Sequence, residues 1–286
     1  MKLKAGFSIT AVMLLVGACG GGGEAGEGQV PTSAPPPPSP IGGGNTSQPP
    51  VLGAACEAEA ERGSARGGIW VGSAQASDPG EMRLLVAETG EFHWITPSGW
   101  DQKIFGTFRA GDRSLTSNDA IWVRVDGLTW LETEFVGVDM TGELDEDSNL
   151  SLSYETDSSP GSHGALSFAA CNSVYTRGSS SASIAGTYVD GGMMLAIDGQ
   201  GVIYLPDRTC VGSGTVEPID PGFNMYRMEL VVNSCASNEV YAIGSAFSGL
   251  AYRGDSGPGF TGNLLEYSLS AAGEQQALIW TSRARR

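Results

Sequence analysis

The sequence predicts an all-β protein built from two tandem antiparallel modules, each a small barrel or a sandwich. Short runs in which apolar and polar residues alternate recur from residue 67 to the C-terminus, and the pattern of the first half returns in the second. Glycine accounts for 42 of 286 residues, which fits many tight turns better than long helices. A helical period is suggested only in the acidic stretch 54–65.

The predicted strands are short and rich in β-branched and aromatic residues. Turn-forming pairs such as Thr89-Gly90 and Asp198-Gly199 bound them, as antiparallel hairpins require. The clearest strands are Ile69–Val71, Arg83–Ala87, Phe92–Ile95, Ile121–Val125, Leu150–Tyr154, Tyr226–Val232 and Ala277–Trp280.

An internal repeat divides this body into two modules, residues 56–177 and 178–286. The first half opens with Gly68–Gly72 and the second with Ile184–Val189, and a strand, a tight turn and a second strand follow each opening. Further strands match in order, Phe105–Phe108 with Gly212–Val216 and Leu150–Tyr154 with Leu264–Leu269. The match is one of pattern rather than identity, and generic antiparallel meanders share such patterns.

The N-terminus predicts export. A basic start with Lys2 and Lys4 precedes the apolar run Phe7–Val16, which at about ten residues is too short to span a bilayer. The run ends in Leu14-Leu15-Val16-Gly17-Ala18-Cys19, which resembles the lipobox of a bacterial lipoprotein. The resemblance implies a signal peptide at residues 1–18 and a mature N-terminus at Cys19, acylated with chains such as palmitate. An ordinary cleaved signal with a chance cysteine is the alternative.

The lipobox resemblance also implies a location and a partner. Two or more acyl chains anchor a protein stably to a lipid bilayer, whereas one binds only marginally. Gly20 rather than aspartate follows the cysteine, which in Gram-negative lipoproteins favours the outer membrane. The body would then face either the periplasm or the cell surface.

Residues 19–55 predict a disordered tether. Four consecutive glycines, the run Pro35–Pro40 and a second glycine cluster leave almost no apolar side chains to bury. The proline run acts as a semi-rigid spacer in this interpretation, with peptide recognition as the alternative. The tether would hold the folded body off the lipid surface.

The body resembles the barrel-bearing outer-membrane lipoproteins, including the transferrin-binding-protein type. The resemblance rests on the Gly-x-Trp and Gly-x-Tyr openings at Gly68 and Gly186, on the short alternating strands, and on the glycine-punctuated turns. It covers residues 67–286 loosely and implies a binding role. No ligand-contact residue of that family carries over onto this chain.

The chain has five cysteines, and an exported protein with Cys19 acylated would keep four for pairing. Of the three connectivities, we favour Cys210 with Cys235, on candidate neighbouring strands, and Cys56 with Cys171, which flank the first module. A zinc site is the alternative, with His93 and His163 as the only histidines, but the chain has no Cys-x-x-Cys pair.

Two segments imitate catalytic or metal-binding loops. Gly254–Pro258 resembles the nucleophile loop of trypsin-type proteases, but neither histidine lies in that family's setting, so we interpret it as a turn. Asp145–Asn149 begins like a calcium loop, yet Leu150 and Thr156 occupy the positions of its glycine and glutamate. We predict an acidic hairpin turn there, with weak cation binding as the alternative.

Most of the six tryptophans are expected to fill the module cores. Trp100 and Trp130 lie beside turn residues and are the better candidates for an exposed, sugar-binding surface. His93 alternates with Phe92 and Trp94 and is expected to face solvent. Arg283, Arg285 and Arg286 form the only basic cluster and are expected to be a frayed end.

Charge excludes one class of partner. The formal net charge is −16, and loss of Lys2 and Lys4 would leave 14 basic against 32 acidic residues, a net charge of −18. Such a surface repels phosphate backbones, so nucleic-acid binding is not expected.

Two function classes remain, and no cofactor or metal is expected in either. The favoured one is a membrane-anchored, non-enzymatic binding or scaffold lipoprotein that engages protein, glycan or a small ligand; the catalytic residues are then none and the ligand contacts unknown. The alternatives are an envelope-acting hydrolase with paired carboxylates, which needs two acids about 5 to 9.5 Å apart in a cleft, and a purely structural envelope protein.

Overall fold

The computed structural model describes residues 66–73, 81–95, 102–125, 133–157, 163–190, 193–206, 210–235, 244, 246–255, 262–272 and 277–286. By its internal contacts the chain divides into two units, Met1–Ser47 and Gln48–Arg286, and every described residue belongs to the second. The signal peptide, Cys19, the tether and the acidic stretch 54–65 lie outside the described residues.

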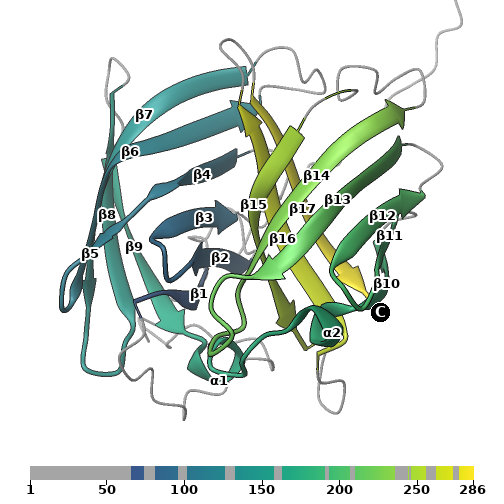
Figure 1. Cartoon of the computed structure of the whole chain (residues 1–286). Helices are drawn as coiled ribbons and strands as arrows, with labels where there is room; N and C mark the ends of the chain where they lie inside the picture. Colours follow the sequence, from purple (N-terminus) through teal and green to yellow (C-terminus); the bar gives the residue numbers. More distant parts are fainter. Residues whose placement is uncertain are drawn as a thin grey trace, which may run out of the picture. The chain divides into compact units, whose positions relative to one another are not determined.

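The first half of the body is a closed antiparallel barrel (Figure 1). Its strands run in the order β4-β3-β2-β1-β9-β8-β7-β6, and pairing of β4 with β6 closes the ring, while the short β5 pairs with β6. The strands are β1 Gly68–Ser73, β2 Glu81–Val86, β3 Glu91–Ile95, β4 Gln102–Thr107, β5 Arg109–Ala110, β6 Ser114–Val125, β7 Thr133–Leu144, β8 Leu150–Thr156 and β9 His163–Ala170.

Two single-turn helices, α1 Asn172–Tyr175 and α2 Ser181–Ile184, connect the barrels (Figure 1). A capping box starts α2: the Ser180 hydroxyl accepts from the backbone N–H of Ser183, and the Ser183 hydroxyl accepts from that of Ser180. Such a box satisfies backbone donors that so short a helix leaves unpaired.

The second half is a barrel closed by consecutive pairing of eight strands from β10 to β17, with β17 returning to β10. The strands are β10 Gly186–Asp190, β11 Met193–Ile197, β12 Val202–Pro206, β13 Cys210–Pro218, β14 Tyr226–Cys235, β15 Ala246–Gly254, β16 Leu264–Ala272 and β17 Ala277–Arg285. The predicted all-β fold with two tandem antiparallel modules is thus confirmed, and both modules are barrels rather than sandwiches.

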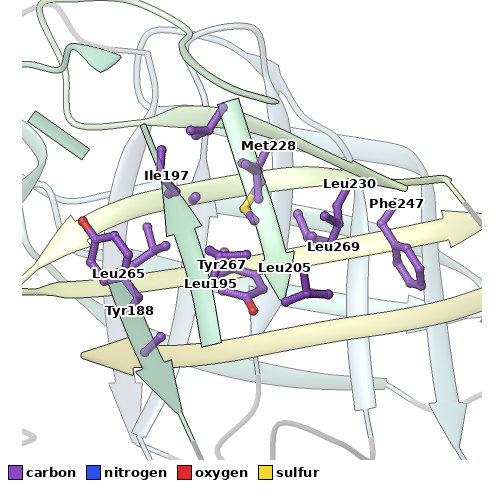
Figure 2. Close-up of a cluster of buried hydrophobic side chains, with 14 of the residues drawn as sticks. Tyr188, Leu195, Ile197, Leu205, Met228, Leu230, Phe247, Leu265, Tyr267 and Leu269 are labelled. Carbon is purple, nitrogen blue, oxygen red and sulfur yellow. The ribbon is translucent and has the colours of Figure 1, made fainter. Parts of the chain in front are cut away.

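Inward-facing apolar side chains from alternate strand positions fill the interior of the second barrel. Along β13 and β14 every second side chain is buried, as a strand with one face in the core requires. Figure 2 shows the resulting cluster, in which aliphatic side chains surround Tyr188, Phe247 and Tyr267. The Tyr188 hydroxyl donates to the carbonyl oxygen of Ile184, a member of the same cluster, at 2.8 Å. The interior of this barrel is therefore a packed apolar core.

The first barrel has an interior built on aromatic rings. Phe92 and Phe108 stack with ring centroids 4.0 Å apart, and Trp70 is buried beside them. The Trp70 indole N–H donates to the carbonyl oxygen of Ser148 at 2.9 Å, which ties β1 to the β7–β8 turn. Trp70 and Trp94 confirm the prediction that tryptophans fill the core, while Trp100 and Trp130 lie outside the described residues.

The sequence repeat corresponds to a structural repeat, visible in the β2–β3 and β11–β12 turns. In the first, Gly90 N–H donates to Ala87 and the Gly90 carbonyl accepts from Phe108 N–H; in the second, Gly201 N–H donates to Asp198 and the Gly201 carbonyl accepts from Val216 N–H. Both glycines have positive φ, 91° and 85°. A Cβ on either would collide with the carbonyl oxygen of Phe108 or Val216, respectively. The two turns therefore need glycine for the same reason.

We predict that Gly201→Ala lowers the free energy of unfolding by about 2 kcal/mol, because alanine is strained at positive φ and its methyl meets the Val216 carbonyl. Gly199, in the same turn, is the control: a Cβ there meets nothing within 4 Å. Urea denaturation of both variants checks this. Equal stability of the two variants would contradict the argument.

The structure also tests the predicted strands, the acidic turn and the C-terminal end. Six of the seven strands named above lie within observed strands, and Arg83–Ala87 runs one residue past the end of β2. Asp145–Asn149 is a hairpin turn between β7 and β8, with the Asp145 carboxylate accepting from the backbone N–H of Asp147 and Asn149. The expected frayed end is wrong, because Arg285 pairs with Val189 and Leu264 in the closed barrel. Strands β5, β7, β9 and β15 were not predicted.

Candidate functional site

The predicted site residues are only partly within the described structure. Cys210 and Cys235 form a disulfide and are direct cross-strand partners of β13 and β14, which confirms that pairing. Cys171 is also disulfide-bonded. Cys19 and Cys56 lie outside the described residues, so the acylation of Cys19 and the Cys56–Cys171 pairing stay predictions.

The protease-like segment is described only in part. Asp255 forms a bidentate ion pair with Arg177, both oxygens at 2.7 Å, and also accepts from the backbone N–H of Gly262. The Arg177 pair and the Gly262 hydrogen bond hold the pKa of the Asp255 carboxyl below its usual value, against the opposing effect of burial. Ser256 lies outside the described residues. Asp255 thus fixes the C-terminal end of β15 to the segment that links the barrels.

A buried interface joins the outer faces of the two barrels, here called the seam. Its apolar part combines Ile69 and Leu85 from the first barrel with Leu250 and Tyr252 from β15 and with Met225 beside β14. Strands β1 and β2 therefore contribute apolar side chains on both faces, one in the barrel core and the other in the seam.

One polar network of the seam is built around Tyr252. The Arg83 Nε donates to the Tyr252 hydroxyl at 3.1 Å, and that hydroxyl donates to Glu266 Oε2 at 2.8 Å. Arg83 Nε also lies 3.6 Å from Glu266 Oε1, and both side chains are nearly inaccessible to solvent. Burial, followed by the negative charge of Glu266, raises the pKa of Tyr252 well above its usual value. The hydroxyl therefore stays protonated and bridges an ion pair between the barrels.

A second network contains three basic side chains: His93 and Lys103 of the first barrel and Arg227 of β14 in the second. Lys103 Nζ donates to the carbonyl oxygen of Leu269 at 2.7 Å, and His93 Nδ1 lies 3.1 Å from Ser268 Oγ. Glu91 Oε1 lies 3.6 Å from His93 Nε2, and Glu91 Oε2 accepts from Arg227 at 3.0 Å. The expectation that His93 faces solvent is wrong. Its side chain does point away from Phe92 and Trp94, but the second barrel covers that face.

Burial in the seam lowers the pKa of two basic side chains, His93 and Lys103. Burial, then the charge of Lys103, lowers the pKa of His93 to about 4, and Glu91 opposes the shift only partly. Burial also lowers the pKa of Lys103 well below its usual value. His93 is therefore neutral at pH 7, which suits its position between Ser268 and Glu91.

We predict that acid weakens the protein through His93. The unfolded chain takes up a proton on this residue below about pH 6.5, whereas the folded chain does so only near pH 4. Stability is therefore lost as the pH falls from 6.5 to 4, by on the order of 2 to 3 kcal/mol. Urea denaturation at pH 7 and pH 4.5 should show a smaller acid loss in His93→Asn. His163→Asn, at the exposed second histidine, is the control and should match the wild type.

An aromatic cluster lies inside the first barrel, towards the ends of β3, β6 and β8. Tyr154 meets Trp94 and Trp122 edge-to-face, with ring centroids 6.0 and 6.2 Å apart, and Trp94 meets Phe168 at 6.2 Å. Trp94 and Phe168 are buried, while Trp122 and Tyr154 are half-buried. We call these four residues the aromatic cluster. It joins the packed core of the barrel to a partly accessible end.

Two polar atoms of this cluster lack a hydrogen-bond partner among the described residues. They are the indole Nε1 atoms of Trp94 and Trp122, and both are buried. A buried donor without an acceptor costs about 1 to 3 kcal/mol, so native proteins rarely leave one unpaired. The aromatic cluster, with the half-buried rings of Trp122 and Tyr154, is the candidate functional site among the described residues.

The described residues contain no group of three or more His, Cys, Asp or Glu side chains placed to hold a metal ion. None of their helices is long and apolar enough to cross a membrane.

No family model and no curated protein matches the chain. Among solved structures it resembles a provisionally assigned outer membrane protein of Bacteroides fragilis, at 10% identity, 77% coverage of this chain, 96% of that chain and a TM-score of 0.23. It also resembles Aeromonas veronii immune modulator A, at 9% identity, 77% coverage of this chain, 94% of that chain and a TM-score of 0.24.

Proposed function

We propose that this protein is a lipid-anchored, non-enzymatic binding protein of the bacterial outer membrane. Acylated Cys19 holds the chain in the bilayer, the tether 19–55 spaces it from the lipid, and the two barrels are the displayed body. The first barrel carries the ligand site, and the second barrel supports it.

The observation that carries the proposal is the aromatic cluster, in which the partly accessible rings of Trp122 and Tyr154 adjoin the buried ring of Trp94. Ligand sites in proteins are mostly apolar and aromatic, with a few polar groups that fix orientation. The cluster has this composition, and its partial accessibility at Trp122 and Tyr154 gives a ligand a route of entry.

The contrast between the barrels supports the division of roles. The second barrel fills its interior with a continuous apolar cluster, and the buried polar groups of the seam bind to each other. Groups engaged in this way hold the barrels together. They are not presented to a substrate, which favours binding over catalysis.

Anchoring is tested by growing cells with an alkyne-labelled palmitate analogue. We expect label on the wild-type protein and none on Cys19→Ser, with the wild type in the outer-membrane fraction and the variant released. Unlabelled wild-type protein that is soluble after processing would overturn the anchored part of the proposal.

Orientation is tested by adding protease to intact cells that express the wild type or Cys19→Ser. Digestion of the anchored body in intact cells indicates surface display and a ligand from the environment. Digestion only after the outer membrane is permeabilised indicates a periplasmic body and a ligand from the envelope.

A further inference from the structure

The outer walls of the two barrels differ in character. In β7 and β8 of the first barrel, the outward-facing positions include Asp139, Glu143 and Glu155, and Asp139 is the direct cross-strand partner of Glu155. In β10, β11 and β12 of the second barrel, the positions that alternate with core residues are all uncharged: Thr187, Val189, Met194, Ala196, Val202, Tyr204 and Pro206. An uncharged wall is therefore a feature of the second barrel.

Exposed apolar side chains gather on the same wall. Among the described residues five large apolar side chains are exposed, and they lie on five consecutive strands, β10 to β14 (Figure 1): Val189, Met194, Tyr204, Val211 and Val231. Tyr204 and Val189 are the most exposed, at 53% and 50%. Single exposed apolar residues are normal on a protein surface, whereas a contiguous set marks an interaction surface.

The strand register places an arginine beside this set. Val189 is the cross-strand partner of Met194 on β11 and of Arg285 on β17. Tyr204 on β12 is the partner of Ala196, two positions along β11 from Met194. Four exposed residues on four neighbouring strands are here called the wall patch: Val189, Met194, Tyr204 and Arg285.

The acidic residues near the wall patch lie at the ends of its strands. Asp190 ends β10 and is half-buried, and Asp198 follows β11, where its carboxylate accepts from two backbone N–H groups of the turn. Asp207 and Arg208 follow β12; they cancel in formal charge and lie outside the described residues. Arg286 is exposed at the start of β10. The patch itself thus combines apolar side chains with a basic one.

The two halves of the body also differ in charge. Residues 56–177 carry 20 acidic and 8 basic side chains, a formal net charge of −12, whereas residues 178–286 carry 10 and 6, a net charge of −4. A negatively charged surface therefore repels the first barrel more strongly than the second. This difference turns the second barrel towards such a surface.

The shape of the wall favours a deformable partner. The outer wall of a closed barrel is convex, and two convex walls meet over a narrow strip, which falls short of the about 800 Å² per partner of a standard protein interface. A lipid surface instead yields to side chains, which enter the boundary between headgroups and acyl chains. Tyrosine is enriched at that boundary, and arginine is attracted by anionic headgroups.

We propose that the wall patch docks the second barrel onto the headgroup region of an anionic lipid bilayer, with the more acidic first barrel away from the lipid. The inference goes beyond the proposed function: acylation anchors the chain, whereas the wall patch sets how the body lies on the bilayer. The tether lets the body turn to reach that position.

The test uses the predicted mature chain, residues 19–286, carrying Cys19→Ser, so that neither an acyl chain nor the apolar run Phe7–Val16 contributes to binding. Co-flotation measures its binding to vesicles of phosphatidylcholine and phosphatidylglycerol in equal amounts, and to vesicles of phosphatidylcholine alone. We expect binding to the mixed vesicles, weakened by high salt because part of the attraction is electrostatic.

Two variants separate the apolar and basic parts of the patch. Tyr204→Thr should lower vesicle affinity about tenfold on both lipid compositions, because it removes the exposed ring. Arg285→Gln should lower it about fivefold on the mixed vesicles only. The matched controls should bind like the parent chain: Val231→Thr, on a strand three places round the barrel from β11, and Arg109→Gln, at an exposed position of the first barrel.

Equal vesicle binding by the parent chain and Tyr204→Thr, or no binding by the parent chain, would overturn the inference. An unchanged midpoint of urea denaturation shows that each variant is folded; if Tyr204→Thr is not, the isosteric Val189→Thr takes its place. Sedimentation velocity without lipid tests the other occupant: a dimer that Tyr204→Thr dissociates would assign the patch to a second copy and overturn lipid docking. None of these results depends on Cys19 acylation or on the aromatic cluster, so the proposed function is tested separately.

Discussion

Glu266→Gln is expected to lower the free energy of unfolding by about 3 to 5 kcal/mol, the typical effect of breaking a buried ion pair. The substitution keeps the size of the side chain and removes its charge. It removes the negative charge that lies 3.6 Å from the buried Arg83 guanidinium, and it weakens the acceptor of the Tyr252 hydroxyl. Urea denaturation of the wild type and the variant measures the effect.

A double-mutant cycle shows whether this effect comes from the ion pair. Arg83→Met removes the buried charge, so Arg83→Met with Glu266→Gln should be less destabilised than the sum of the two single variants by at least about 1 kcal/mol. Glu229→Gln, on an exposed position of β14, is the matched control and should change stability by less than about 0.5 kcal/mol. Additive effects at Arg83 and Glu266 would show that the two charges do not interact.

Replacing both Cys210 and Cys235 by alanine is expected to lower the free energy of unfolding by about 3.5 kcal/mol. The disulfide closes a loop with a sequence separation of 25 between β13 and β14, and the loop-entropy model gives this value for such a loop. Loss of sulfur packing adds to it, because Cys210 is buried in the apolar cluster of the second barrel.

The measurement compares oxidised wild type with the double alanine variant in urea. Substitution is preferable to a reducing agent, which would also open the disulfide of Cys171. Val211→Ala, at an exposed position next to Cys210, controls for a general effect of altering β13. A loss below about 1 kcal/mol would show that the closed loop is already ordered in the unfolded chain or that the bond is strained.

Much of the fold could be predicted from the residues because it depends on local chemistry. Alternation along runs such as Tyr226–Val232 identifies strands with one face in a core, and glycines such as Gly90 and Gly201 mark turns that need positive φ. Strand β9 escaped prediction because its small residues and Gly164 dilute the alternation. Strand β7 was missed although buried and exposed residues alternate from Val138 to Glu143, the same signal that predicted β8.

The candidate site was only partly within reach of the sequence. Alternation correctly placed Trp94 and His93 on opposite faces, and it correctly placed the tryptophan in the core. It could not show that Trp94 and Trp122 both contact Tyr154, since the three residues come from three strands up to 60 residues apart. Nor does any local pattern reveal whether an indole N–H has an acceptor.

The sequence by itself determined the class of fold, its division into two repeated modules, the tight turns and the Cys210–Cys235 pairing. These features depend on each residue and its near neighbours along the chain or across a hairpin. Only the tertiary structure decided that His93, Lys103 and Arg83 are buried, because a strand shows which side chains share a face but not what covers that face. Because the second barrel covers the outer face of the first, these three bases lie between the barrels and bind groups of the second.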